Sequence, residues 1–178
     1  LLGEHQLHNA ATVLEAVSVL RKQGWDIDDE AVESGLYSVA WPARFEVLHT
    51  DDPWFVLDGG HNPQCAAALR ECLEHYFPDS KRVALVGVLK DKDYKSIAAM
   101  LAPLFDACVC VTPPSERALP AEELAELFKD SCREVCVADT VEDGVDLARD
   151  IAQEQDAMVC AFGSLYICGQ IRSCFGLR

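Results

Sequence analysis

Short apolar runs alternate with amphipathic stretches over most of the chain. Runs of this length are typical of strands that are buried in a sheet. The runs are Phe45–His49, Trp54–Leu57, Arg82–Val88, Ala107–Val111, Glu134–Val137 and Ala157–Phe162. Between and after them, apolar residues recur at helical spacing. This spacing predicts helices over Gln64–Tyr76, Tyr94–Leu104, Ala121–Lys129, Val141–Gln153 and Leu165–Phe175.

The alternation predicts an α/β fold: a Rossmann-like, three-layer domain with a six-stranded, mostly parallel sheet covered by helices on both faces. Only the first two runs are too close for a helical crossover, because Thr50–Pro53 alone separates them. A connection this short fits a hairpin. We therefore expect the first strand to be antiparallel and at or near a sheet edge.

The first forty residues are helical and differ in character from the rest. One helix is expected over His5–Lys22, and a second, Asp29–Val39, ends before Trp41-Pro42 because a residue that precedes proline is pushed out of the helical region. The first has an apolar face made by Ala10, Val13, Leu14, Val17 and Leu20. Two helices alone do not make a core, so the first forty residues are predicted to be an appendage to an α/β domain, whose pattern begins at Phe45.

Charge excludes several classes of partner. The chain of 178 residues carries 30 acidic and 15 basic residues, a formal net charge of −15. This excess opposes non-specific binding to nucleic acids and to anionic membrane surfaces. No apolar stretch is long enough to span a bilayer. We expect a soluble, cytoplasmic protein with no nucleic-acid or membrane partner, whose phosphate sites are built from a few local cations, backbone amides or a metal ion.

The nine cysteines lie mainly in apolar runs, and no two of them have the CxxC spacing. A thiol in such a run behaves as a small buried hydrophobe. We expect Cys108 and Cys110 to point to opposite faces of their strand, and Cys132 with Cys136 lacks a matching second pair. The cysteines therefore predict neither a metal site nor a disulfide framework. They indicate a reducing compartment.

The segment Asp58–Pro63, DGGHNP, is the most informative in the chain because it stands between a predicted strand and a predicted helix. A carboxylate, two glycines, an imidazole and an amide meet there at a helix N-terminus, where free N–H groups favour an anion such as phosphate. Pro63 suits the first helical turn. An equally weighted interpretation is an ordinary turn in which Asn62 caps the helix and His61 lies on the surface.

Three further polar segments follow predicted strands: Leu89–Asp93, Thr112–Ser115 and Gly163–Tyr166. In open α/β sheets, ligands bind beyond the carboxyl ends of the parallel strands, so these segments and Asp58–Pro63 form one predicted site. Asp58 is a candidate for holding a nucleotide or magnesium, with helix capping as the alternative. Lys90 and Lys92 are candidate phosphate contacts, although Asp91 and Asp93 also fit an acid-capped helix start.

Two more side chains carry a functional and a structural interpretation each. Arg44 lies at the boundary between the helical appendage and the sheet domain, where a guanidinium is placed to bind phosphate. Ser164 is a candidate contact for a substrate carboxylate, and the alternative is a helix N-cap. The sequence has no GxxxxGK[ST] loop, GxGxxG fingerprint or GxSxG elbow, so an ATP-dependent activity requires a phosphate cradle from elsewhere. Because helical signals begin almost at Leu1 and no initiator methionine is present, we expect a piece of a longer polypeptide.

Five motifs occur in a characteristic order: GEHQLHNA (3–10), WPARFEVL (41–48), LDGGHNP (57–63), LKDKD (89–93) and FGSLY (162–166). With these motifs the chain resembles the C-terminal portion of folylpolyglutamate synthase, often bifunctional with dihydrofolate synthase, within the Mur ligase superfamily. Two positions depart from the family pattern. Ala43 stands where the family usually has glycine, and Gly60 where alanine is common.

The resemblance implies an ATP-dependent, amide-bond-forming ligase of folate biosynthesis and one-carbon metabolism. In this family ATP phosphorylates a carboxylate of dihydropteroate or of a folate's terminal glutamate. The amine of L-glutamate then attacks the acyl phosphate, and ADP and phosphate are released. Such chemistry needs Mg²⁺ and cationic or N–H donors around the phosphates and the tetrahedral oxyanion.

Site residues and domains follow from the same resemblance. It implies ATP contacts by Asn9, Arg44 and Asp58, and it places His61, Ser164 and Lys92, with Asp93 nearby, at the reacting γ-phosphate or the incoming glutamate. ATP and Mg²⁺ would be held mainly by an N-terminal ATPase domain that this chain lacks. Residues 1–40 would be the helical end of that domain and a linker, and 41–178 the Mur ligase C-terminal (glutamate ligase) domain, inactive alone and part of a monomer.

Two other interpretations remain open. One is the C-terminal domain of a Mur-type ligase of peptidoglycan precursors, against which the HQ in Gly3–Asn9 and the GSLY segment favour the folate branch. The other is a non-catalytic, nucleotide-binding α/β module that keeps the Asp58–Pro63 turn.

Overall fold

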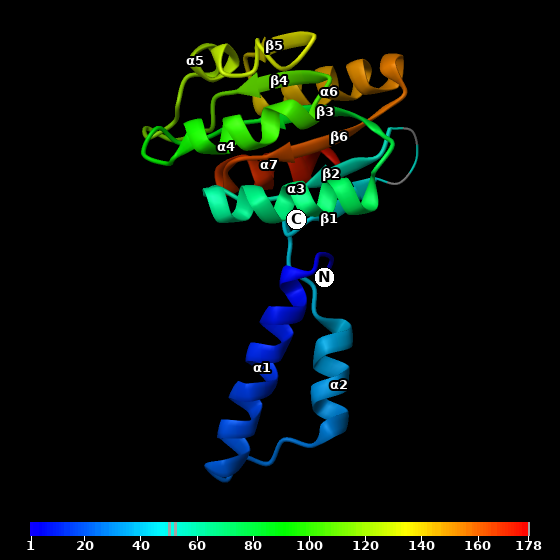
Figure 1. The fold of residues 1–178 in the computed structure, drawn as a ribbon, viewed down its shortest axis with the longest axis vertical. Coiled ribbons are helices and arrows are strands. Elements are labelled where there is room, and N and C mark those ends of the chain that lie inside the picture. The colour runs from blue at the N-terminus through cyan, green and yellow to red at the C-terminus, as the bar shows by residue number, and fades with distance from the viewer. Residues whose placement is uncertain (50, 52, 178) are drawn as a thin grey trace. The chain divides into compact units, whose positions relative to one another are not determined.

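The computed structural model describes residues 1–49, 51 and 53–177 (Figure 1). The chain divides into two compact units, Leu1–Pro42 and Ala43–Arg178, which we call the helical unit and the sheet unit. The division falls two residues after the boundary expected from the sequence. Each unit is described by itself.

The helical unit contains α1 (His5–Lys22) and α2 (Asp29–Ser38). Asp28 caps α2 by accepting a hydrogen bond from the Ala31 N–H, and Arg21 pairs with Asp29 at 2.8 Å, so the two helices are tied together at one end. None of the described side chains of α1 or α2 is buried. Of the apolar face predicted for α1, Ala10, Val13 and Val17 line an open groove against α2, whereas Leu14 and Leu20 are exposed outside it.

The sheet unit is built on six strands in the order β1-β2-β6-β3-β4-β5. Their bounds are β1 Glu46–His49, β2 Phe55–Leu57, β3 Lys81–Val86, β4 Ala107–Val111, β5 Glu134–Ala138 and β6 Ala157–Phe162. The pair β1–β2 is antiparallel, and every other pair is parallel. The α/β fold class is therefore confirmed, with the antiparallel strand at an edge. Thr50 and Asp52 of the predicted hairpin lie outside the described residues.

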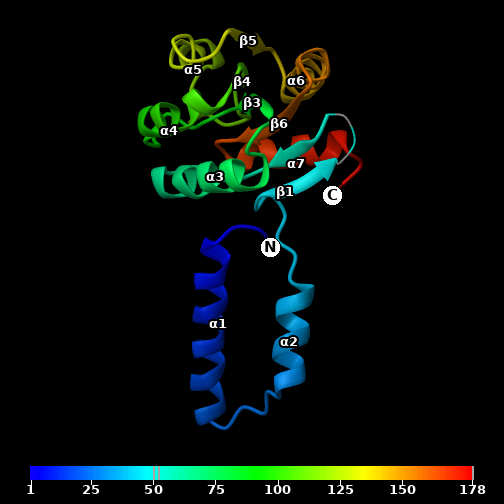
Figure 2. The ribbon, with the colours of Figure 1, turned by 45° about the vertical axis from the view of Figure 1, so that its right-hand side comes forward.

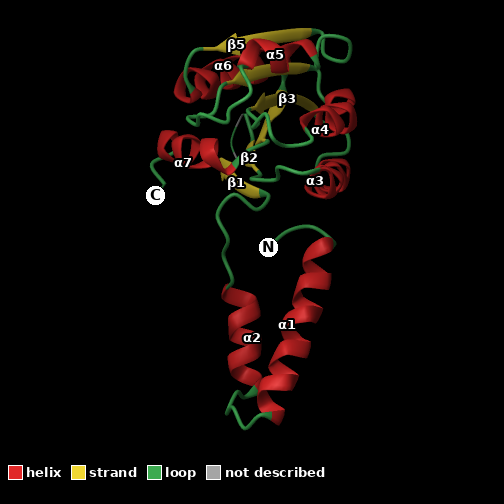
Figure 3. Ribbon diagram, turned by 90° about the vertical axis from the view of Figure 1, so that its left-hand side faces the viewer, coloured by secondary structure: helices red, strands yellow, loops and turns green. Residues whose placement is uncertain are grey.

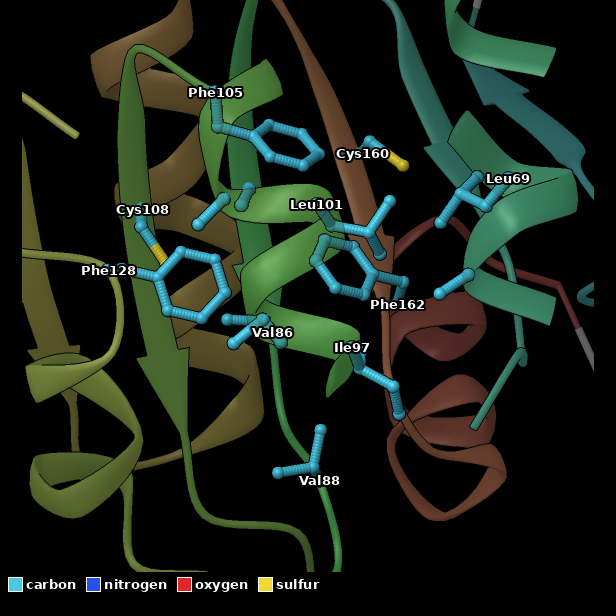
Figure 4. Packing of buried hydrophobic residues seen from close by; sticks show 14 of the residues in the cluster. Leu69, Val86, Val88, Ile97, Leu101, Phe105, Cys108, Phe128, Cys160 and Phe162 are labelled. Carbon is cyan, nitrogen blue, oxygen red and sulfur yellow. The ribbon is translucent and has the colours of Figure 1, made fainter. Parts of the chain in front are cut away.

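Helices cover both faces of the sheet (Figures 2 and 3). On one face lie α3 (Pro63–Tyr76), α4 (Tyr94–Leu101), the short 3₁₀ helix η1 (Ala102–Leu104) and α5 (Ala121–Glu126). On the other lie α6 (Val141–Gln155) and α7 (Leu165–Cys174). Each layer seals its own apolar cluster. In the first, the Phe105 and Phe162 rings stack 5.5 Å apart, and residues of α3, α4, β3 and β4 pack beside them (Figure 4).

Two predicted helices are shorter than the apolar pattern indicated. The helix expected over Tyr94–Leu104 ends as a 3₁₀ turn that contains Pro103, a residue without the N–H that an α-helix needs. The helix expected over Ala121–Lys129 ends at Glu126. There the Phe128 N–H bonds to the Ala125 carbonyl three residues back, and the Phe128 ring is fully buried. Burial of one aromatic ring thus outweighs another helical turn.

The expectation for Cys108 and Cys110 is wrong. Their sulfur atoms lie 3.6 Å apart and both belong to the first apolar cluster. Side chains alternate along a strand, so residues two apart share a face. All nine cysteines are free thiols, and within the described ranges no group of three or more histidine, cysteine or acidic side chains is arranged to hold a metal. None of the helices described combines the length and hydropathy that a membrane span needs.

The topology has a switch point at one edge of the sheet. The chain leaves β2 into α3 and β3 into α4 on one face, but it leaves β6, which lies between them, into α7 on the other face. Neighbouring strands whose connections diverge in this way leave a gap beyond their carboxyl ends, where α/β proteins bind ligands. The segments after β2, β6 and β3 are three of the four that the sequence marked as candidates, and the fourth, Thr112–Ser115, follows β4.

Candidate functional site

Asp58 directly follows β2 and is buried, with 8% of its surface exposed. Its Oδ1 accepts a hydrogen bond from the Gly60 N–H at 2.7 Å, and its Oδ2 accepts one from the Phe45 N–H at 2.9 Å. Neither donor belongs to α3, so helix capping is wrong for this residue. The carboxylate instead joins its own turn to the segment that precedes β1, and it brings negative charge to the end of β2.

Asn62 caps α3, as one interpretation of the turn predicted: its side chain accepts a hydrogen bond from the Cys65 N–H at 2.8 Å, and Pro63 is the first helical residue. The half-buried His61 places Nδ1 3.1 Å from the Gly59 carbonyl oxygen. Because a carbonyl only accepts, Nδ1 carries the hydrogen. In the neutral ring Nε2 is then the nitrogen that can accept a proton from a ligand.

Arg44 lies in the segment that Asp58 holds. Both of its neighbours have left-handed backbone angles, with φ of 55° at Ala43 and 45° at Phe45. The Gly59 N–H donates to the Ala43 carbonyl at 2.7 Å, so this segment runs alongside the turn after β2. The Arg44 side chain is half-buried, and within the described residues its guanidinium has no hydrogen bond or ion pair.

Ser164 follows β6 and is buried at 2% exposure. Its Oγ accepts a hydrogen bond from the Tyr166 N–H at 3.2 Å, which makes it the N-cap of α7. The preceding Gly163 has a φ of 110°, and a Cβ there would lie 2.7 Å from the Gly87 carbonyl oxygen after β3. A Cβ on Gly59 would clash with the Leu165 side chain. The segments that follow the three strands therefore pack closely against one another.

The charged segment after β3 has mostly structural partners. Asp91 pairs with Arg117 at 3.1 Å, Asp93 caps α4 through the Ser96 N–H, and the Lys90 ammonium donates to the Glu116 carbonyl at 3.2 Å. The acid-capped helix start is thus confirmed for Asp93. Lys92 is half-buried, and its ammonium has no partner among the residues that the structure describes. Of the two lysines, Lys92 is the one available to a ligand.

The structure brings five of the six predicted site residues to one edge of the sheet unit. These are Arg44, Asp58, His61, Lys92 and Ser164, which come from the segments before β1 and after β2, β3 and β6. Asn9 belongs to the helical unit, where it is exposed on α1 and donates to the Gln6 Oε1 atom at 2.9 Å.

Thiols behind the site are not reactive. Burial, with the nearby Asp58 carboxylate as the next cause, raises the pKa of Cys168 to about 12 and that of Cys72 to about 11. Both thiols are protonated at neutral pH, and the thiolate is the nucleophilic form of cysteine. Neither of these two thiols is therefore a candidate nucleophile.

Residues 43–165 match the family model for the Mur ligase, glutamate ligase domain. The match covers more than half of the chain. It contains every candidate residue of the sheet unit, from Arg44 to Ser164. The chain belongs to this family.

Three relatives extend the comparison. The dihydrofolate synthase/folylpolyglutamate synthase of Mycobacterium tuberculosis is 35% identical over 99% of this chain and 39% of its own length. A crystal structure of the folylpolyglutamate synthase of that organism, complexed with ADP and AMPPCP, matches with a TM-score of 0.88 at 34% identity, over 100% of this chain and 41% of the other. The bifunctional enzyme of Yersinia pestis, complexed with AMPPNP and a Mn ion, matches at 30% identity with a TM-score of 0.72, over 91% of this chain and 38% of the other. The chain spans about two fifths of the length of these relatives.

Sequence reasoning missed the partners that position the candidates. Glu46 and Arg172, which form an ion pair beside Ala43, and Gly87, which receives Gly163, were not singled out. Glu46 stands inside the WPARFEVL motif, so its proximity to Arg44 was readable. Its pairing with a residue of α7 was not, because no local pattern connects the two.

Proposed function

We propose that this chain is part of an ATP-dependent ligase that joins L-glutamate to dihydropteroate, to a folylpolyglutamate, or to both, through an acyl phosphate. Membership of the glutamate ligase family and the names of the relatives support the proposal. The observation that carries it is the edge of the sheet where β2, β6 and β3 end, at which Arg44 and Lys92 present cations without a partner in the described chain. Phosphates and a carboxylate substrate need such cations in a chain of net charge −15.

Arg44 and Asp58 contact the nucleotide in this proposal, together with Asn9 of the helical unit. The Arg44 guanidinium suits a phosphate because its planar fork of donors matches two phosphate oxygens. Asp58 contributes mainly by holding the turn and the Arg44 segment together, since two backbone N–H groups already occupy its oxygens.

His61, Ser164 and Lys92 act on the reacting groups. The Nε2 atom of His61 accepts a proton from the ammonium of glutamate, so that the neutral amine can attack the acyl carbon. Ser164 and the N-terminus of α7 bind a substrate carboxylate. The Lys92 ammonium stabilises the oxyanion that forms before phosphate leaves.

ATP is the substrate that supplies the phosphoryl group, and magnesium is its expected companion. The two crystal structures contain ADP and AMPPCP in one case and AMPPNP with a Mn ion in the other. The described residues of this chain include no group of three or more metal-binding side chains, so they do not fit a metal site of their own. We place the metal and most nucleotide contacts in a preceding ATPase domain.

The helical unit supports the existence of that domain. Its helices bury no described side chain, and the groove between them is lined by apolar residues that include Leu7, Val13, Val32 and Leu36. We propose that residues 1–40 are the helical end of the ATPase domain and that 41–178 are the ligase domain, which is inactive without it.

The deciding experiment is an assay of the full-length protein that contains this chain. ADP release is measured with ATP and L-glutamate, using dihydropteroate in one series and tetrahydrofolate in another. We expect glutamate-dependent release with at least one acceptor. Absence of glutamate-dependent turnover with both acceptors would refute the proposal. ADP release with a peptidoglycan precursor alone would move the chain to the Mur-type branch, and nucleotide binding without turnover to a non-catalytic module.

A further inference from the structure

The segment Ala43–Phe45 is held in an unfavourable backbone conformation at both of its ends. Ala43 and Phe45 are non-glycine residues with φ of 55° and 45°. The left-handed region brings Cβ close to the following carbonyl, and non-glycine residues stay there only when their surroundings hold them. Arg44 lies between the two, so its direction depends on what holds this backbone.

Two carboxylates hold the segment from opposite ends. Asp58 accepts a hydrogen bond from the Phe45 N–H, and Glu46 accepts one from the Ala43 N–H through Oε2 at 2.8 Å. The other carboxylate oxygen of Glu46 pairs with the Arg172 guanidinium of α7. Of the ion pairs between described residues, this one is the least exposed, with side-chain exposures of 13% for Arg172 and 23% for Glu46.

We infer that Glu46, anchored by Arg172, is a positioning residue that keeps the Ala43–Phe45 backbone in the conformation from which Arg44 reaches the phosphates of the nucleotide. The inference rests on the proposed function, because it takes Arg44 as a phosphate contact. Glu46 and its ion pair with Arg172 do not contact the nucleotide in this inference. They act on it only through Arg44.

The physical reason is the competition between two backbone states. Without an acceptor for its N–H, Ala43 is free to return to the ordinary extended region, and the peptide that carries Arg44 rotates with it. Arg172 keeps the Glu46 carboxylate in place, because α7, which Ser164 caps, packs on the sheet. The ion pair thereby connects the helix after β6 to the orientation of Arg44.

The test is a double-mutant cycle in the full-length protein, with KM for ATP and kcat measured separately. Arg44→Ala should raise KM for ATP about tenfold through loss of a charged contact. Glu46→Ala should raise it about three- to tenfold in the presence of Arg44 and leave it unchanged on the Arg44→Ala background. Glu46→Gln keeps an oxygen for the Ala43 N–H, so we expect it to restore most of the affinity.

A second measurement reports on the backbone without any ligand. Trypsin cleaves after arginine, and the new N-terminus at Phe45 can be quantified by mass spectrometry. We expect Glu46→Ala to increase the rate of cleavage at Arg44 about tenfold, because a released segment enters the protease more often. Val145→Ala, which removes buried methyl groups from α6, serves as the control for general loss of stability and should change neither this rate nor KM for ATP.

The outcomes separate the two proposals. If Arg44→Ala leaves KM for ATP unchanged, the nucleotide role of Arg44 in the proposed function is wrong and the inference fails with it. If Arg44→Ala raises KM but Glu46→Ala does not, or raises it equally on both backgrounds, only the positioning role is overturned. A cleavage rate at Arg44 equal to that of the Val145→Ala control would also overturn it.

Discussion

Ala43 shows how a single residue balances conformation against packing. Its Cβ is buried in the second apolar cluster, yet its φ of 55° is one that glycine adopts without strain. The chain has alanine where the resembled family usually has glycine, so it gains a buried methyl group and accepts strain. Gly60 is the opposite case. A Cβ there would lie 2.7 Å from the Asp58 Oδ1 atom and 2.8 Å from the Cys65 Cβ atom, so this turn accommodates alanine only if one of them moves.

Replacing Ala43 with glycine should stabilise the protein slightly. Relief of the left-handed conformation is worth about 1–2 kcal/mol, and loss of the buried methyl group and the greater flexibility of the unfolded chain offset most of it. We expect a net gain of about 0.5 kcal/mol in the free energy of unfolding, measured by urea denaturation. Ala99→Gly at an exposed position of α4 should instead lose about 1 kcal/mol, and equal effects of both changes would contradict the account.

Buried thiols should make the protein sensitive to alkali. The pKa of Cys72 and of Cys132 is raised to about 11 and that of Cys168 to about 12, chiefly by burial, against 9.0 for a free thiol. Above pH 9 the unfolded chain loses these protons while the folded chain retains them, so unfolding is favoured increasingly as the pH rises toward 11–12. We expect the free energy of unfolding to be unaffected by these thiols below pH 9 and to fall above it. Cys168→Ala should reduce that slope, and parallel curves for the two proteins would refute the assignment.

At the scale of elements, the junction between α3, β3 and η1 is secured by one side chain. Arg82, which lies in β3 with 9% of its surface exposed, donates hydrogen bonds to the carbonyls of Leu73, Phe77 and Leu104. These carbonyls lie in the last turns of α3 and η1 or just after α3, and those of Leu73 and Phe77 also accept the N–H groups of Phe77 and Ser80. A guanidinium is needed because its donors point in several directions at once.

Arg82→Lys should therefore destabilise the sheet unit although it keeps the charge. A lysine ammonium on a flexible stem cannot serve all three carbonyls, and a hydrogen bond from a charged group is worth about 1.5–3 kcal/mol. We expect a loss of about 2 kcal/mol in the free energy of unfolding, read from urea denaturation. Arg70→Lys, in the exposed pair with Glu74 on α3, is the matched control and should change it by at most about 0.5 kcal/mol. Similar losses for the two variants would show that the capping role is misassigned.

At the scale of the whole molecule, the sheet unit concentrates its candidate chemistry where three strands end. Gly87 and Gly163 let the backbones after β3 and β6 approach each other, and Gly59 makes room for the Leu165 side chain at the start of α7. The site thus depends on close contacts between segments that are distant in sequence. The helices that follow these strands lie on opposite faces of the sheet, an arrangement at which α/β proteins bind ligands.

Gly163→Ala should be among the most damaging substitutions of a small residue. Its φ of 110° is unfavourable for a side chain, and the added Cβ would lie 2.7 Å from the Gly87 carbonyl oxygen. We expect a loss of about 2–4 kcal/mol in the free energy of unfolding, together with reduced turnover in the full-length protein because Ser164 moves with the strand end. Gly169→Ala in α7 has open space around its Cβ and should be neutral or stabilising by up to about 1 kcal/mol. Equal stability of the two variants would contradict the proposed convergence.

Much of the fold was predictable from local pattern. The predicted bounds of α1, β4 and β6 agree with the structure, and the antiparallel edge strand followed from a short connection. Errors arose where a tertiary contact outweighed a local preference, as at Phe128, or where the strand period was misapplied, as at Cys108 and Cys110. The candidate residues that gather at the strand ends were also predictable, because carboxyl ends of parallel strands share one edge.

By itself the sequence determined the fold class, the caps of α3 and α7, and the edge of the sheet where polar residues collect, because each depends on residues close together in the chain. Only the tertiary structure decided that β6 enters the sheet between β2 and β3, that Asp58 holds Phe45 rather than a helix, and that Glu46 pairs with Arg172. Those contacts join residues 13 and 126 positions apart. Their energies depend on burial and geometry that form only when the sheet is complete.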